Sequence, residues 1–330
     1  MHGIECMCKC TIAIPTYNRE DNIGDTIESA LMQDIPDLEI LVIDDRSTDH
    51  TFDTAQSYSD PRIRVVRNKV NVGLFGNFNR CLELANGQYL RILCDDDKLT
   101  PGCIRREVDI MDANQNVALL FSKGQRIDES GRKVGPVGDH FRQGIYAGVD
   151  AIYAVLWFKA YYAINPITLP SGVLLRKEEV NKTGWFDTTM KLEGDVDFWL
   201  RILEHGDMAV LQSFGCEIKY HPCQVSQRLL GDIEATREAF TITEKYEGLL
   251  QKRGSYNRIR QQLAAYSLLI AYKLRRLGLY KESREHLDLA RTSNVNKTAA
   301  SLAVVRLISL RLLMKITGVR LVPMRLLREI

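Results

Sequence analysis

The sequence lacks the long hydrophobic runs that mark membrane-spanning proteins. None of its 330 residues lies in an uninterrupted apolar run of 18 or more, so no transmembrane helix is predicted. The segment Met1–Glu5 carries neither the charged nor the apolar region of a signal peptide. Together these two absences predict a cytosolic protein.

Several common binding patterns are also missing. There is no G-x-G-x-x-G and no G-K-[ST] sequence, which excludes dinucleotide-binding and P-loop ATP sites of those types. Cys6, Cys8 and Cys10 lack the C-x₂-C pairs of a zinc site, and several of the eight cysteines lie in apolar runs. They are therefore expected to be reduced core thiols rather than a disulfide frame. A formal net charge of +2 offers no general argument for nucleic-acid binding.

Short apolar segments of strand character alternate with stretches of helical spacing in the first hundred residues. The segments cover residues 10–14, 38–43, 63–66 and 89–93. This alternation predicts an α/β protein with a Rossmann-like, doubly wound and mainly parallel sheet. Right-handed crossovers would place the polar loops after Ile14, Ile43 and Leu93 at one edge of that sheet, where such folds bind ligands.

The loop after the last of these segments holds three consecutive carboxylates, Asp95, Asp96 and Asp97. Such a triplet repels itself when desolvated, so it needs either open water or a cation. A hard divalent ion (Mg²⁺ or Mn²⁺), held by one or two carboxylates and by substrate phosphates, would meet that need. The alternative is a solvated acidic turn in which Asp97 or Thr100 caps a helix that begins at Pro101.

Taken together, the loop motifs resemble those of family 2 glycosyltransferases of the GT-A fold. The matching motifs are I-P-T-Y-N-R at 14–19, V-I-D-D-R-S-T-D at 42–49, N-V-G at 71–73, N-G-Q-Y at 86–89 and the acidic triplet, and the likeness covers roughly residues 10–229. It implies a catalytic domain over 1–230, with a nucleotide-sugar-binding half at 10–115 and an acceptor half at 116–230. Residues 231–330 would form a helical, basic C-terminal extension.

The resemblance implies transfer of a sugar, with inversion, from a nucleotide-sugar donor to a hydroxyl of a glycan or lipid-linked acceptor in cell-surface polysaccharide synthesis. UDP is the commonest nucleotide in that family. The residues that match its donor-binding positions are Pro15, Thr16, Tyr17, Glu20, Asp44, Asp45, Asn71, Gly73, Asn77 and Asp95. Those that match metal-binding positions, for Mn²⁺ or Mg²⁺, are Asp96, Asp97 and His221, and Asp195 matches the catalytic base.

The sequence departs from the family pattern at three positions. Cys94 stands where the usual first Asp of the acidic motif falls, and Phe78 stands where many members carry an Arg. Gly194 precedes Asp195 where the family has Glu, so the base is kept and its neighbour is lost. Asp197, in the first turn of the same predicted helix, is expected to act as its N-cap.

Two stretches outside the motifs have distinct characters. Residues 124–148 are rich in glycine and charge, which predicts an extended loop. Beyond residue 232 the pattern is helical, and 264–272 with 278–287 are expected to form one antiparallel helix pair.

The final residues, 298–330, carry six basic side chains against one acid. They are expected either to cap the catalytic domain with a solvated basic face or, the reading we favour, to lie on an anionic cytoplasmic membrane.

Two rival functions remain open from the sequence. A sugar nucleotidyltransferase would show a glycine-rich loop bearing Lys or Arg after the first strand, whereas this chain has P-T-Y-N at 15–18. A nucleotide-sugar-binding or scaffold protein without activity is compatible with the departures at Cys94 and Gly194.

Overall fold

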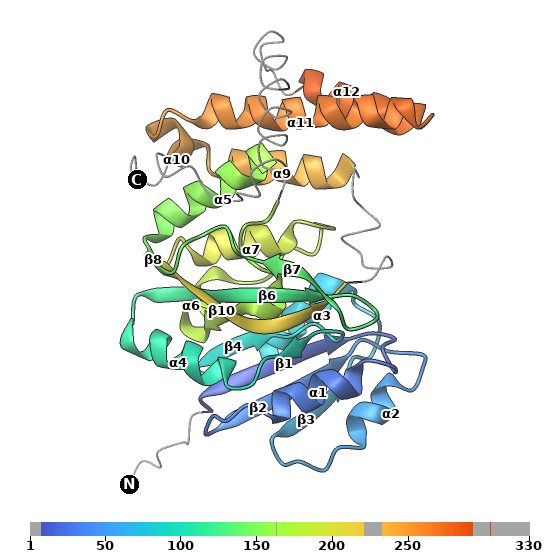
Figure 1. Cartoon of the computed structure of the whole chain (residues 1–330), viewed down its shortest axis with the longest axis vertical. Helices are drawn as coiled ribbons and strands as arrows, with labels where there is room; N and C mark the ends of the chain where they lie inside the picture. Colours follow the sequence, from blue (N-terminus) through green and yellow to red (C-terminus); the bar gives the residue numbers. More distant parts are fainter. Residues whose placement is uncertain (1–7, 163, 221–232, 293–303, 305–330) are drawn as a thin grey trace. The chain divides into compact units, whose positions relative to one another are not determined.

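The structure, a computed structural model, describes residues 8–162, 164–220, 233–292 and 304 (Figure 1). Its strands form one ten-stranded sheet within those residues. They are β1 (Cys10–Thr16), β2 (Leu38–Asp44), β3 (Ile63–Arg67), β4 (Tyr89–Ile92), β5 (Lys98–Leu99), β6 (Val117–Ile127), β7 (Lys133–Val137), β8 (Gly144–Tyr146), β9 (Val173–Arg176) and β10 (Asp207–Lys219).

The order of the main path through the sheet is β3-β2-β1-β4-β9-β6-β10-β5, with β7 paired to β6 and β8 to β10. Neighbours among β3, β2, β1 and β4 run parallel, and β6 runs parallel to β10. Strand β9 is antiparallel to both β4 and β6. The sheet is therefore mixed but mainly parallel on its N-terminal side, which confirms the predicted fold class.

Helices connect many of the strands and form most of the described residues after β10. They are α1 (Ile23–Leu31), α2 (Thr51–Gln56), α3 (Leu74–Leu84), α4 (Cys103–Ala113), α5 (Gly148–Tyr162), α6 (Lys177–Thr183), α7 (Gly194–Ile202), α9 (Ile233–Lys245), α10 (Glu247–Lys252), α11 (Tyr256–Arg276) and α12 (Tyr280–Thr292), with a 3₁₀ turn η1 at Pro170–Gly172. Helices α1 and α3 both contact β1, whose residues are all buried. The continuous apolar run of β1 is what a strand covered on both faces requires.

Contacts divide the chain into two compact units. Unit 1 comprises residues 1–148, 167–188 and 194–221, and it contains the sheet. Unit 2 comprises 149–166, 189–193 and 222–330, and its described part is helical apart from short connections. The domain boundary that the sequence suggests, between a catalytic domain at 1–230 and an extension at 231–330, stays a prediction.

In unit 2, α11 and α12 form the antiparallel pair that the sequence predicts. Ser267 donates to the carbonyl of His286, and Ser283 donates to the carbonyl of Ala271, so the two helices run past each other in opposite directions. No helix in the described ranges is long and apolar enough to span a bilayer.

One local prediction is wrong, and so is the alternative interpretation of the acidic triplet. Residues 124–148 are not one extended loop, because β6 continues to Ile127 and β7 and β8 add strands at its edges. Neither Asp97 nor Thr100 caps α4, since β5 follows the triplet and Gly102, at φ +65°, is the N-cap. The glycine there suits a left-handed position that other residues rarely adopt.

Candidate active site

Three loops converge at the carboxyl ends of β1, β2 and β4. Thr16 pairs with Asp44 in the parallel register, and the N–H of Asp45 donates to the carbonyl of Thr16 at 2.8 Å. The N–H of Leu93 donates to the carbonyl of Ala13 at the same edge. The loops after β1, β2 and β4 therefore meet where an open α/β sheet presents its ligand crevice.

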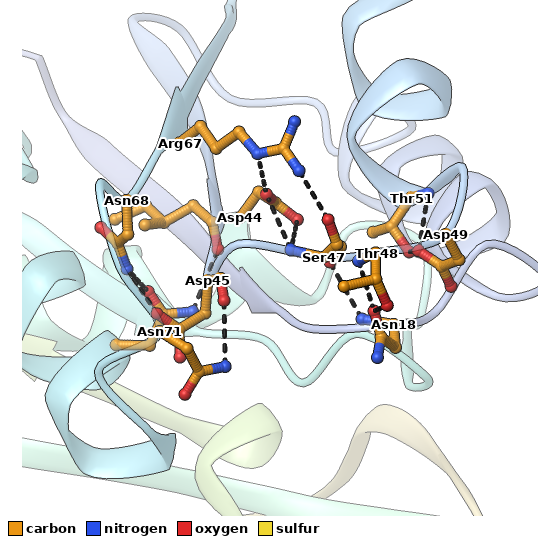
Figure 2. Close-up of polar contacts among 12 residues, drawn as sticks. Asn18, Asp44, Asp45, Ser47, Thr48, Asp49, Thr51, Arg67, Asn68 and Asn71 are labelled. Atoms are coloured by element: carbon orange, nitrogen blue, oxygen red, sulfur yellow. Dashed lines mark hydrogen bonds and ion pairs between the residues drawn. The ribbon is translucent and has the colours of Figure 1, made fainter.

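The loop after β1 presents Tyr17 to solvent. Pro15 and Thr16 are buried at the end of the strand, whereas Tyr17 is 46% exposed. Asn18 accepts the N–H of Thr48 at 2.8 Å, and Asn18 has a φ of +53°. This bond joins the first two loops, as Figure 2 shows.

Glu20 also joins these two loops. It is exposed, and its Oε2 accepts the N–H of His50 at 2.9 Å.

Asp44 is fully buried beneath the second loop. Its carboxylate accepts the N–H of Ser47 and forms an ion pair with Arg67 at 3.0 Å (Figure 2). A buried charge must be paired and hydrogen-bonded to be tolerated, and these contacts meet that need. Asp44 therefore shapes the loop from within.

Asp45 organises the next loop in the same way. Its oxygens accept the N–H groups of Val72 (2.9 Å) and Gly73 (3.0 Å) and the side-chain amide of Asn68 (2.8 Å). Gly73 has a φ of +77°, a left-handed conformation that favours glycine. The Asn71 side chain donates to the carbonyl of Asp45 (Figure 2).

Asn77 completes this support. Its amide donates to the carbonyl of Ile43 at 3.0 Å and accepts from Asn68 at 3.0 Å, and the residue is buried. Among the predicted donor-binding side chains, Asp44, Asp45 and Asn77 are thus buried and bonded within the protein. Asn71 and Gly73 are exposed.

The three carboxylates of the acidic triplet have different surroundings. Asp95 is partly buried; its Oδ2 accepts the N–H of Tyr17 at 3.2 Å, and its Oδ1 lies 3.4 Å from Arg19. Burial raises the pKa of Asp95 to about 6, while the positive charge of Arg19 opposes that rise. Asp96, the next residue, is partly exposed.

Asp97 is buried and bonded on both oxygens. The hydroxyl of Ser171 donates to its Oδ2 at 2.6 Å, and the N–H of Lys219 donates to its Oδ1 at 3.0 Å. Burial, followed by the negative charge of Asp96, raises its pKa well above the usual value. The predicted metal role of Asp97 therefore falls on a carboxylate that holds the loop to η1 and β10.

A buried polar network continues below the triplet. Ser171 also accepts the N–H of Cys94 at 3.0 Å, and its carbonyl accepts Arg91 at 2.9 Å. Arg91 is fully buried and ion-paired with Glu107, which accepts a hydrogen bond from Ser122. The sequence motifs do not single out Ser171 or Glu107. The signal that points to them is the single Arg within the apolar β4, because a buried guanidinium requires a partner.

Asp195 lies in the first turn of α7. It is partly exposed, and its Oδ1 accepts the N–H of Val196 at 2.7 Å. Asp197 is not the N-cap that the sequence predicts: it is fully buried and pairs with Arg201, one turn later, at 2.9 Å.

The aromatic side chains near α7 account for two departures from the family pattern. A Cβ on Gly194 would lie 2.6 Å from Cζ of Phe75, so this ring fills the space of a side chain. Phe78 packs edge-on against Phe75 (5.9 Å between centroids) and Phe186 (5.4 Å). Phe78 is thus a core residue of an aromatic cluster.

The predicted metal ligand His221 lies outside the described residues, as does the basic segment 298–330 apart from residue 304. Within the ranges that are described, no group of three or more His, Cys, Asp or Glu side chains is arranged to hold a metal. Any metal here would have to complete its coordination with other oxygens, such as those of a substrate.

Comparison with known proteins finds a matching family and several related sequences. The model of the family described as Glycosyl transferase family 2 matches residues 11–154. The chain is 35% identical over 105 residues to the Escherichia coli protein UDP-Glc:alpha-D-GlcNAc-diphosphoundecaprenol beta-1,3-glucosyltransferase WfaP, covering 32% of this chain and 42% of that protein. Matches to other curated relatives cover 41% and 61% of their lengths, so the chain spans less than two thirds of these proteins.

Two solved structures share the fold. S. aureus TarS 1-349 in complex with UDP-GlcNAc has a TM-score of 0.57 at 18% identity, over 86% of this chain and 90% of that chain. The mannosyltransferase PcManGT from Pyrobaculum calidifontis, in complex with GDP-Man and Mn²⁺, has a TM-score of 0.53 at 17% identity, over 92% and 80%. At these identities the comparison shows a shared fold.

Proposed function

We propose that the chain transfers a sugar from a nucleotide-sugar to an acceptor hydroxyl, with inversion at the anomeric carbon, because the model of glycosyltransferase family 2 matches residues 11–154. The observation that carries the proposal is the meeting of three loops at one sheet edge, where Tyr17 and Asp96 are accessible and where Asp45 and Asp97 are buried and hydrogen-bonded within the protein. An accessible Tyr17 ring and Asp96 carboxylate, on loops that internal hydrogen bonds hold in place, suit the binding of a nucleoside diphosphate.

The donor is proposed to be a UDP-sugar. The TarS complex contains UDP-GlcNAc, and the name of WfaP gives UDP-Glc as its donor, which supports this choice of nucleotide. Tyr17 is proposed to stack on the base with its exposed ring, and Asp95, which accepts the N–H of Tyr17, is proposed to bind the ribose. Pro15, Thr16 and Glu20 set the shape of that loop.

Asp96 is proposed as the residue that would hold a divalent cation. A cation held by one carboxylate and by phosphate oxygens is a usual arrangement for Mg²⁺ or Mn²⁺, and it does not need a three-residue protein site. When bound, such an ion would stabilise the negative charge that the leaving nucleoside diphosphate gains. Asp97 is proposed to keep Asp96 in place through its bonds to Ser171 and Lys219.

Asp195 is proposed as the general base. Its carboxylate lies at the start of α7, is partly exposed, and would accept the proton of the acceptor hydroxyl as that oxygen attacks the anomeric carbon. One base without an enzyme nucleophile implies a single displacement and hence inversion. Glycoside hydrolysis would need two carboxylates that flank the scissile bond, which this layout suits less well.

The acceptor is proposed to be a glycan or lipid-linked sugar used in cell-surface polysaccharide synthesis. The acceptor in the name of WfaP is a sugar on diphosphoundecaprenol, which supports that class. A lipid-linked acceptor would bring the protein to the inner face of the cytoplasmic membrane, as proposed for the basic segment 298–330. The full chain should then sediment with phosphatidylglycerol vesicles and not with phosphatidylcholine vesicles; equal sedimentation would contradict membrane binding.

The rival without turnover is a nucleotide-sugar-binding or scaffold protein. A nucleotidyltransferase is less well supported, because the loop at 15–18 has no glycine-rich basic segment. Release of nucleoside diphosphate from UDP-, GDP- and dTDP-sugars, with Mn²⁺, Mg²⁺ or EDTA, separates these functions. Metal-dependent release from one donor supports the transferase; nucleotide binding without release, also with added lipid-linked acceptors, supports the scaffold.

A further inference from the structure

The segment that leads into Asp195 belongs to the helical unit. Residues 189–193 fall in unit 2 together with most of α5 and with α9 to α12, whereas α7, which begins at Gly194, falls in unit 1. The proposed base is thus two residues beyond Glu193, the last residue of a segment held by another unit. Residues 191–193 therefore lead directly, through the chain itself, into the turn that carries Asp195.

One carboxylate holds this segment. Glu238, in the middle of α9 and 9% exposed, accepts three consecutive backbone N–H groups. Its Oε1 accepts Lys191 at 2.6 Å, and its Oε2 accepts Leu192 at 3.0 Å and Glu193 at 2.8 Å. Hydrogen bonds to an ionised acceptor are shorter and stronger than neutral ones. Three of them on successive residues fix the backbone of the segment at each peptide group.

A second contact holds the same segment from α5. The carboxylate of Glu193 forms an ion pair with Lys159, and their side chains are only 10% and 14% exposed. An exposed ion pair would contribute little, but a pair shielded from water constrains its partners more. Glu193 is therefore held at its backbone by α9 and at its side chain by α5.

We propose that Glu238 is a positioning residue for Asp195: the helical extension holds residues 191–193 so that α7 begins with Asp195 aimed at the acceptor hydroxyl. This inference rests on the proposed function, in which Asp195 is the base. General-base catalysis depends on the base lying within hydrogen-bond reach of its proton, and a displacement of about 1 Å can cost roughly 10²-fold in rate. The extension then contributes to the acceptor side of the reaction and not to donor binding.

The test uses a graded pair of variants with a matched control. Glu238→Gln keeps one acceptor oxygen but turns an NH₂ group toward a backbone N–H, so it retains only part of the contact. Glu238→Ala removes all of it. Glu244→Gln makes the same charge change on the same helix at an exposed site, where Glu244 faces Arg260.

The expected result separates positioning from overall stability. We expect Glu238→Ala to lower kcat for transfer by about 10- to 100-fold, with Glu238→Gln between it and the wild type, and with the donor KM changed less than ~2-fold. Amide hydrogens of residues 191–193 should exchange faster in both variants, while Glu244→Gln leaves rate and exchange unchanged. If Glu238→Ala does not fold, Glu238→Gln alone tests the proposal, which then requires a lower kcat for transfer with a nearly unchanged donor KM.

A double variant distinguishes action through Asp195 from a general structural effect. If Glu238 acts through the base, adding Glu238→Gln to Asp195→Asn should cost little further rate, because coupled residues are not additive. Losses that multiply, or a normal kcat together with faster exchange at 191–193, would overturn the proposal. Normal turnover by Asp195→Asn would instead refute the proposed base, while the exchange data would still report whether Glu238 holds the segment.

Discussion

We call the loops after β1, β2 and β4, where the donor is proposed to bind, the donor edge. The donor edge and the segment before Asp195 are both shaped by buried carboxylates that accept backbone N–H groups, but these carboxylates reach their partners in different ways. At the donor edge, Asp44 and Asp45 lie at the end of β2 and bond to loops of the same sheet. Before Asp195, the carboxylate is Glu238, which comes from a helix of the C-terminal extension 45 residues further along the chain. The donor edge is thus built into the sheet, whereas the approach to the proposed base depends on the extension.

The comparison predicts that donor and acceptor functions can be damaged separately. Changes at the donor edge should affect nucleotide binding and metal dependence. Changes around α7 should affect transfer while nucleotide binding persists. The following variants test that separation, beginning with the one expected to have the largest effect.

Asp96→Ala should damage the donor side most. We expect metal-stimulated release of nucleoside diphosphate to fall by roughly 10³-fold, equivalent to several kcal/mol of charge stabilisation. The measurement is the release rate across a Mn²⁺ titration. Asp34→Ala is the control, because the side chain of Asp34 is 97% exposed. An unchanged titration would remove Asp96 from the metal site.

Asp195→Asn should damage the acceptor side alone. Because a general base contributes about 10²- to 10⁴-fold, we expect kcat for transfer to fall at least ~10²-fold. Calorimetric titration with UDP should show near-normal affinity, which the comparison requires. Glu204→Gln, at an exposed position just after α7, provides the control. If Asp195→Asn lost UDP affinity as well as transfer activity, the proposed separation of donor and acceptor functions would be wrong.

Asp97→Ala tests whether the third carboxylate of the triplet is structural. Its removal leaves the Ser171 hydroxyl and the Lys219 N–H without their acceptor. We expect the free energy of unfolding to fall by about 2–4 kcal/mol, measured by urea titration. The Mn²⁺ concentration for half-maximal turnover should shift far less than in Asp96→Ala. The opposite pattern would make Asp97 a metal ligand.

Gly194→Ala tests the packing beneath the proposed base. The added Cβ would lie 2.6 Å from the ring of Phe75, so we expect a loss of about 1–3 kcal/mol in unfolding free energy. Combining it with Phe75→Leu should recover part of that loss, because the two residues compete for one space. Gly248→Ala is the control, since its Cβ would meet nothing within 4 Å. Simple additivity of the two changes would contradict this explanation.

The smallest effect is expected at Asp128, a carboxylate whose hydrogen-bond partners are all nearby in sequence. It accepts hydrogen bonds from Ser130 and Arg132 in the β6–β7 turn, and these lower its pKa from 3.8 to about 2. A lowered pKa in the folded state means that the contribution to stability is present above the unfolded pKa and is lost as pH falls through about 2. The melting temperatures of wild type and Asp128→Asn should therefore differ at pH 5 and converge near pH 2. A constant difference would show that the turn does not depend on the charge.

Much of the fold was predictable because its signals are short. Apolar runs of strand type, each followed by a polar loop, specify parallel strands and a binding edge whatever lies further along the chain. The loop of Tyr17 and the acidic triplet were found in this way. The strands β7 and β8 were not, because edge strands rich in glycine carry little hydrophobic pattern.

The candidate site was only partly readable for a related reason. Residue type identified Asp95, Asp96 and Asp97 as a group, but their burial differs, and it depends on Ser171 and Lys219, which lie 74 and 122 residues from Asp97. Asp197 is different, because its partner Arg201 lies only four residues further along α7, a spacing at which opposite charges on a helix pair.

The sequence by itself determined the order of strands and loops, the sugar-transferase resemblance and the residue types at the sheet edge, because these depend on patterns within a few residues of one another. Only the tertiary structure decided which carboxylates face solvent, why glycine precedes Asp195, and that Glu238 holds the segment before it. Burial and hydrogen-bond partners come from residues that folding brings together over long separations. A buried carboxylate must find its donors wherever the fold supplies them.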